Sequence, residues 1–149
     1  MFYTIREPAD AGVIATHFNQ FHDACLVRLS LSWANYLDNQ KSLHLYERGN
    51  CTLSLSHYNY DHAQAPFHEN VRIDLADVAD FRADFSSFQP SDWAITELTV
   101  APANGVDAVA FDMACTWNYF ANGTWMSKMA LQLRFREAGI WERDSQLSG

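Results

Sequence analysis

Four side chains that could bind a metal ion lie within a short stretch of the chain: His57, Asp61, His62 and His68. Imidazole nitrogens together with a carboxylate oxygen suit zinc or non-haem iron, and three such ligands beside an open position would make a catalytic site. Histidines outside a complete metal motif are more often solvated loop residues, and that interpretation is favoured here. A metal-dependent enzyme that uses this cluster to hold a divalent cation is therefore an alternative rather than the main expectation.

His22 and Asp23 form a second pair whose residue types could do chemistry. A carboxylate orients a histidine in a catalytic triad, but neighbouring residues of an extended chain point in opposite directions. A structural role is therefore favoured for both residues. We expect Asp23 to accept backbone amides where the first long strand begins, and His22 to tie an N-terminal helix to the sheet.

Tyr58 and Tyr60 lie close to His57, near the expected end of a strand. Aromatic residues make up 14% of the chain, and most of them follow the alternating apolar pattern of a core. A barrel or sandwich whose mouth is lined by the remaining Tyr and Trp residues could hold a small apolar or sugar ligand. Ligand binding in such a β cavity is a second alternative, with Tyr58 and Tyr60 as ligand-binding or structural residues.

The chain contains none of the linear motifs of common enzymes: no nucleophile elbow, phosphate-binding loop, dinucleotide fingerprint or zinc-protease motif. Active sites assembled only in space leave no linear motif, so catalysis is not excluded. No catalytic residue is assigned, and a binding function is favoured over an enzymatic one.

Charge and composition exclude several classes of protein. The 149 residues include 10 basic and 18 acidic side chains, and the net charge of −8 would repel a phosphate backbone or an anionic lipid surface. No apolar run is long enough to span a membrane. The three cysteines lack paired spacing and the first residues lack a signal sequence, which favours reduced thiols and a cytoplasmic location. The length fits a single domain over residues 1–149, with a protein or a small molecule as its partner.

Alternation of apolar and polar residues is the dominant pattern and predicts half-buried strands. Cys25–Trp33 is the first of them, with its odd-numbered residues on one buried face. Val109–Trp117 and Trp125–Phe135 follow the same rule, and Asn122-Gly123 between them is a strong hairpin signal. Further strands are expected at 43–46, 51–60, 71–75, 93–100 and 140–143, with Glu47–Asn50 as a hairpin turn, Glu137–Gly139 as a connection and 140–143 at a sheet edge.

Two segments depart from this two-residue period. In residues 8–18, Pro8 stands at a suitable first helical position and apolar residues recur at helical spacing. In residues 76–88, apolar residues recur every three or four positions, which predicts a second helix or, alternatively, a strand from Val71–Leu75 that continues through a bulge. The predicted fold class is mainly β (α+β): an antiparallel sheet, sandwich or partly open barrel with one or two short helices.

Four aspartates would form an acidic stripe on the second of these helices: Asp74, Asp77, Asp80 and Asp84. An acidic face can steer a protein onto a basic partner by electrostatic complementarity. Charged stripes on helices are more often simply solvated, so both interpretations stay open.

Residues 21–31, with the sequence Phe-His-Asp-Ala-Cys-Leu-Val-Arg-Leu-Ser-Leu, carry a resemblance, together with Thr52–Leu55 and Val71–Leu75. This first half of the chain resembles a loose group of small bacterial β-rich proteins that begin with a Phe-His-Asp or similar triplet. The group includes uncharacterised families and immunity proteins encoded beside secreted toxins. The resemblance implies a non-enzymatic, immunity-like bacterial protein whose acidic face binds a basic protein partner.

Overall fold

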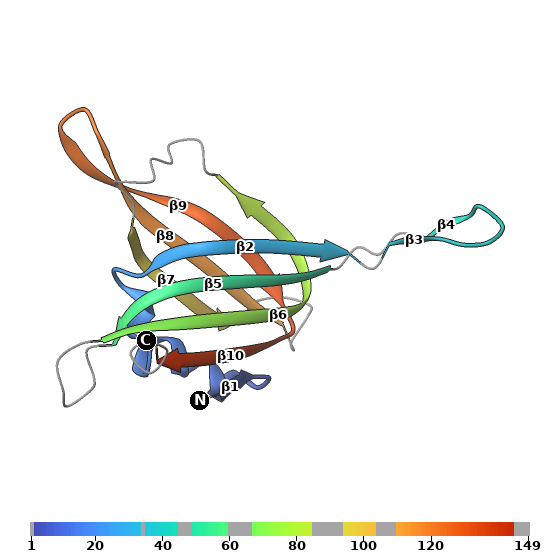
Figure 1. Cartoon of the computed structure of the whole chain (residues 1–149), viewed down its shortest axis with the longest axis horizontal. Helices are drawn as coiled ribbons and strands as arrows, with labels where there is room; N and C mark the ends of the chain where they lie inside the picture. Colours follow the sequence, from blue (N-terminus) through green and yellow to red (C-terminus); the bar gives the residue numbers. More distant parts are fainter. Residues whose placement is uncertain are drawn as a thin grey trace.

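The computed structural model describes residues 2–33, 35–44, 49–59, 67–84, 94–103 and 110–144 (Figure 1). The elements in chain order are β1 (Phe2–Ile5), η1 (Pro8–Gly12), α1 (Val13–Thr16), η2 (Asn19–Phe21), β2 (Cys25–Trp33), β3 (Tyr36–Leu37), β4 (Leu43–His44), β5 (Gly49–Asn59), β6 (Phe67–Ala83), β7 (Ala94–Pro102), β8 (Phe111–Ala121), β9 (Thr124–Phe135) and β10 (Glu137–Asp144). The two η elements are short 3-10 helices. The predicted mainly β fold with short helices is confirmed.

Eight of these strands form one antiparallel sheet that curls on itself. Its main path runs β1-β10-β6-β9-β8-β7, while β5 pairs with the other side of β6 and β2 pairs with β5. The 17-residue β6 is long enough to pair with β10 in its first part and with β9 in its last part. In Figure 1, the layer of β2, β5, β6 and β10 therefore crosses in front of the layer of β7, β8 and β9.

A single hydrophobic core fills the space between the two layers. Between the bulges, alternation places every second residue of each strand inside. The buried residues of the long strands are Cys51, Leu53 and Leu55 in β5, Val71, Ile73, Leu75 and Val78 in β6, Phe111, Met113, Cys115 and Trp117 in β8, and Ala130, Leu131, Leu133 and Phe135 in β9. The N-terminal helical turns lie against β7. Their buried side chains are Ala11, Ile14, Phe18 and Phe21, and the last two rings stack with centroids 4.8 Å apart.

The segment predicted as a second helix over 76–88 is a strand as far as Ala83, so the bulged-strand alternative is the right one. Asp77 and Asp80 have left-handed backbone angles, with φ of 55° and 53°. Aspartate adopts that region more readily than most residues, so each can stand at a bulge in the strand. The two bulges let β6 bend from one layer into the other. Residues 85–88 lie outside the described part of the chain.

A bulge in β9 changes which of its residues are buried. Cys115 pairs with Leu131 but Thr116 pairs with Met129, so Ala130 is an extra residue. The predicted common face of Trp125, Ser127, Met129 and Leu131 is therefore wrong: Trp125 is 60% exposed and Met129 is 45% exposed, whereas Leu131 is buried. The Asn122-Gly123 hairpin turn is confirmed, and both residues have positive φ, 53° and 76°.

A similar shift lies between Leu26 and Arg28 in β2, where Val27 is the extra residue. Val27 is 68% exposed, while Leu26, Leu29 and Leu31 pack against the core. The predicted buried face of odd-numbered residues therefore fails at Cys25 and Val27, which are exposed. Trp33 is exposed as well, although it is in phase with Leu31, and it is the last residue of β2.

Two predicted connections differ from the observed ones. Leu43–His44 pairs with Tyr36–Leu37 instead of with the strand after Glu47–Asn50, because the turn forms earlier, where the Asp38 carboxylate accepts the backbone N–H groups of Gln40 and Ser42. At the other end, Arg136 alone separates β9 from β10. Glu137–Gly139 is therefore strand rather than connection, and β10 lies between β1 and β6 rather than at an edge.

Candidate functional site

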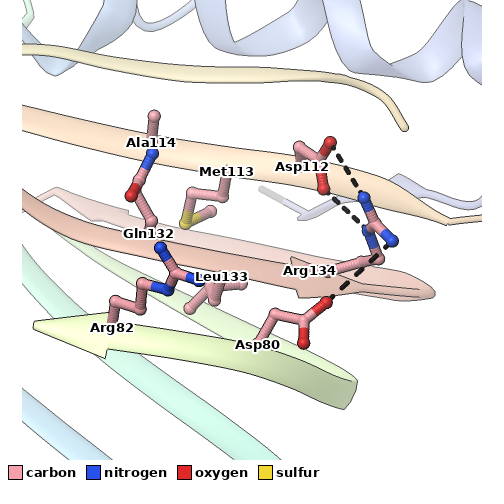
Figure 2. A pocket seen from close by; sticks show the side chains of 8 residues that line it. All are labelled: Asp80, Arg82, Asp112, Met113, Ala114, Gln132, Leu133 and Arg134. Atoms are coloured by element: carbon pink, nitrogen blue, oxygen red, sulfur yellow. Dashed lines mark hydrogen bonds and ion pairs between the residues drawn. The ribbon is translucent and has the colours of Figure 1, made fainter. Parts of the chain in front are cut away.

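An open hollow of about 400 Å³ lies on the outer face of β6, β8 and β9 (Figure 2). The residues that line it are Asp80, Arg82, Asp112, Met113, Ala114, Gln132, Leu133 and Arg134. Met113 and Leu133 have their side chains in the core, so the chemistry of the hollow comes from the five polar residues around Ala114.

The strand period and one bulge explain why these polar groups meet. Asp112 alternates with the buried residues Phe111 and Met113, so it points outward, and Arg134 of β9 does the same directly opposite it. The register between β6 and β9 contains a bulge: Ala79 pairs with Arg134, and Arg82 pairs with Gln132. Two residues of β6, Asp80 and Phe81, therefore lie opposite the single residue Leu133 of β9. Phe81 packs against the core, and this bulge places both Asp80 and Arg82 on the outer face.

Arg134 organises one wall of the hollow. Its Nε donates a hydrogen bond of 2.9 Å to Oδ1 of Asp112, and its Nη2 donates one of 3.4 Å to Oδ2. The third guanidinium nitrogen, Nη1, lies 4.0 Å from Oδ2 of Asp80, which is an ion pair but too long for a hydrogen bond. Exposed pairs of this kind contribute little to stability, about 0–1 kcal/mol. Their main effect here is to fix the positions of the two carboxylates (Figure 2).

The other wall of the hollow has unused hydrogen-bonding capacity. Within the described residues, neither the Arg82 guanidinium nor the Gln132 side-chain amide makes a hydrogen bond or ion pair, although the two residues pair across β6 and β9. An arginine presents five N–H donors and a glutamine amide presents donors and an acceptor. This wall can therefore bind an anionic or polar group from solution.

A second cluster joins residues that are far apart in the sequence: Tyr3, His17 and Glu142. Nε2 of His17 lies 2.8 Å from Oε1 of Glu142 and 2.9 Å from the Tyr3 hydroxyl. The Glu142 side chain is only 8% exposed, since it lies on the inner face of β10 opposite buried Val71. Because the same imidazole nitrogen faces both partners, the cluster ties α1 and β1 to β10 rather than presenting a base to solvent. The sequence offers one clue to this cluster: Glu142 lies two positions after Ile140, so its charged side chain is on the same buried face of β10.

His22 and Asp23 connect the N-terminal turns to β7. Nδ1 of His22 donates a hydrogen bond of 2.7 Å to the Thr96 carbonyl. The Asp23 carboxylate differs from expectation: its partner among the described residues is Nε2 of His22 at 3.6 Å, not a backbone amide. Asp23 instead contributes its backbone, which has a φ of 65° and donates its N–H to the Ile95 carbonyl at 2.8 Å.

The predicted metal ligands fall mostly outside the described part of the chain. Tyr60, Asp61 and His62 lie there entirely, and the side chains of His57, Tyr58 and His68 do so as well. The backbone register pairs Tyr58 with His68 and His57 with Glu69. Among the described residues, no group of three or more His, Cys, Asp and Glu side chains is placed to hold a metal ion. The metal site therefore stays a prediction.

The four aspartates predicted as an acidic stripe do not share a helix face. Asp74 pairs with Arg72 at 3.1 Å, Asp80 with Arg134, and Asp84 with Lys128 at 3.1 Å. Asp77 is exposed at a bulge. Three of the four charges are thus balanced by a neighbouring cation, which weakens the case for a continuous acidic docking face.

Large apolar side chains are exposed on two hairpins that project from the body (Figure 1). The β8–β9 hairpin carries Trp125, Met126 and Met129, between 44% and 60% exposed, which we name the tip patch. The β3–β4 hairpin carries Leu37 and Leu43, 64% and 63% exposed, with Trp33 at its base.

No protein-family model, curated protein or solved structure matches this chain. Among the described residues, no helix has the length and apolar character needed to cross a membrane. Function is therefore inferred from the residues themselves.

Proposed function

We propose that this protein works by binding another protein, with the tip patch of the β8–β9 hairpin as the contact surface. The observation that carries the proposal is the exposure of Trp125 and Met129, which share one face of β9, together with Met126 on the opposite face of the same hairpin. Exposed apolar side chains that gather in one place mark interaction sites, and tryptophan and methionine are enriched where proteins meet. Tryptophan is also among the residues that dominate binding energy.

The backbone supports the same conclusion. The bulge at Ala130 turns Trp125 and Met129 away from the face on which Leu131, Leu133 and Phe135 are buried. Bulges often re-aim side chains beside functional sites. Without the bulge, Trp125 and Met129 would lie on the same face as Leu131 and Leu133.

A basic protein is the partner that the charge favours. The net charge of −8 would attract a basic surface over long range, while the tip patch would supply the short-range contact. An immunity-like protein in the bacterial cytoplasm, as the resemblance of residues 21–31 implies, fits this combination. A small ligand inside the sheet is less well supported, because the inner faces of the described strands carry buried apolar side chains such as Phe111 and Phe135, which belong to one core cluster.

The test compares the wild type with a Trp125→Ser, Met129→Ser double variant as baits in lysate of the source cells. Trp33→Ser is the matched control, since Trp33 is a similarly exposed tryptophan at the other projecting hairpin. A basic protein captured by the wild type is then purified and titrated by calorimetry. We expect the double variant to bind at least about tenfold more weakly, a loss of about 1.4 kcal/mol, while the control binds normally. Equal binding by the double variant, or no captured protein, overturns the proposal.

A further inference from the structure

The outer-face hollow of β6, β8 and β9 offers two groups of opposite charge that make no hydrogen bond with the described residues. Arg82 makes no ion pair with these residues either, and Asp80 makes a long ion pair of 4.0 Å with Arg134 that leaves its carboxylate oxygens open to a hydrogen-bond donor. Both groups come from the same strand and line the same hollow (Figure 2). The neighbouring Asp112 and Arg134 are bonded to each other, so they form a fixed wall rather than a second pair of free groups.

The size and the floor of the hollow fit a small molecule. Its volume of about 400 Å³ lies within the usual range for ligand sites, roughly 300–1,000 Å³. Ala114 forms the floor between Thr99 and Gln132, its partners on the neighbouring strands, and its single methyl group leaves the space open. Gln132, whose amide makes no hydrogen bond with the described residues, stands beside Arg82 as a further donor.

We infer that this hollow binds a small zwitterion such as a free α-amino acid, with the carboxylate on Arg82 and Gln132 and the ammonium group on Asp80. Guanidinium groups bind carboxylates in a bidentate geometry, and a carboxylate is the natural acceptor for an ammonium group. The inference does not depend on the tip patch or on a protein partner.

The charge of the protein favours a zwitterion over a simple ion. A free anion would be repelled by the net charge of −8 and by the carboxylates of Asp80 and Asp112 in the same hollow. A free cation would meet the guanidinium groups of Arg82 and Arg134 in the same hollow. A molecule with both charges and no net charge avoids both penalties, because each end lies against its own partner.

The experiment is an NMR titration of isotope-labelled protein that follows the Arg82 Nε–H and the Gln132 side-chain amide. The probes are L-alanine, its carboxylate-only and amine-only fragments propionate and ethylammonium, and inorganic phosphate. We expect saturable shifts with L-alanine and weaker binding of each of the other probes. Arg82→Gln should weaken L-alanine binding about tenfold or more, because a charge-assisted pair is lost.

Two further variants make the test specific. Asp80→Asn should weaken the binding of L-alanine but not of propionate, because it removes the partner of the ammonium group and a long ion pair with Arg134 but leaves Arg82 and Gln132 in place. Arg28→Gln is the control: Arg28 is also an exposed arginine, but it belongs to β2 and does not line the hollow, so binding should be unchanged. Absence of saturation, equal binding by Arg82→Gln, or phosphate or propionate bound as tightly as L-alanine overturns the inference.

Discussion

The Glu142 carboxylate lies 2.8 Å from the His17 imidazole across 125 positions of sequence. The contact joins the end of α1 to the inner face of β10, where only 8% of the Glu142 side chain is exposed. A carboxylate in such a place needs a hydrogen-bond donor, because burial without one costs free energy. His17 supplies that donor and so determines where the N-terminal turns are held.

Removing His17 should therefore destabilise the fold. We expect His17→Ala to lower the free energy of unfolding by about 1–3 kcal/mol, because the buried carboxylate loses its contact with the imidazole. His22→Ala is the comparison, since His22 is about half exposed and bonds a carbonyl instead of a carboxylate. Urea denaturation measures both, and an equal or larger loss for His22→Ala would contradict this view of the pair.

Two tryptophans of the β8–β9 hairpin should respond very differently to truncation. Trp117 is 2% exposed, and Trp117→Ala should cost about 3–5 kcal/mol through loss of packing and a new cavity. Trp125 is 60% exposed, and Trp125→Ala should cost less than about 1 kcal/mol. Thermal or urea unfolding distinguishes them, and similar losses would mean that the bulge at Ala130 is misplaced.

Three glycines form a graded series for alanine substitution. A Cβ at Gly49 would lie 2.4 Å from the Ser32 carbonyl oxygen, so Gly49→Ala should be strongly destabilising, by more than about 2 kcal/mol. At Gly139 the nearest atom, at 3.0 Å, belongs to the Phe2 side chain rather than to the backbone, so it can move aside more easily and the cost should be smaller. Nothing lies within 4 Å at Gly12, which should tolerate alanine. Any other order in the unfolding midpoints would contradict the packing described for these strands.

The backbone of Asp23 is in the left-handed region, and this determines which substitutions the protein should tolerate there. A different set would be tolerated if the carboxylate were the important group. Asp23→Val should cost about 1–2 kcal/mol, because a β-branched residue is strained at a φ of 65°. Asp23→Gly removes the carboxylate but relaxes the backbone, so stability should stay near that of the wild type. If glycine were as damaging as valine, the side chain rather than the backbone would be what matters.

The buried cysteines predict a loss of stability at alkaline pH. Burial raises the pKa of the Cys51 thiol to about 11 and that of Cys115 to about 12, from a reference value of 9.0. In the unfolded chain these thiols ionise near pH 9, whereas in the folded protein they stay neutral. Their contribution is therefore unchanged below pH 9, and stability falls as the pH rises toward 11 or 12.

Urea titrations between pH 8 and about pH 11 measure this slope. The Cys51→Ala, Cys115→Ala variant should show a shallower one, because lysines and tyrosines titrate identically in both proteins. A slope that is the same in the two proteins would assign the effect to other groups. At pH 8 a thiol reagent should modify exposed Cys25 rapidly in the folded protein and the other two only after denaturation.

Local patterns in the sequence were sufficient to predict most of the strands. The alternation of Phe111, Met113, Cys115 and Trp117 needs no knowledge of the partner strand, and Asn122-Gly123 carries its own turn geometry. Bulges are different, because the extra residue exists only relative to a partner. Ala130 and Val27 look like ordinary strand residues until Cys115 and Leu55 are placed opposite their neighbours. Each such shift moves the following side chains to the other face.

The candidate sites were harder to predict for the same reason. Asp80 and Arg82 belong to a segment whose spacing resembled a helix, and only their pairing with β9 brings them beside Arg134 and Gln132. The His17–Glu142 contact spans almost the whole chain, so no local pattern encodes it. A carboxylate in phase with buried Ile140 was the single available clue.

The shared strand β6 has a consequence for how the protein unfolds. Because its residues 69–76 hold β10 while its residues 79–83 hold β9, loosening β6 would release both sides of the core at once. The pairing of β6 with β9 and β10 joins residues that are distant in sequence, so forming it costs a large loop-closure entropy. Folding should therefore be slow and cooperative, with a single transition seen by every probe, and neither half should survive alone as a separate folding unit.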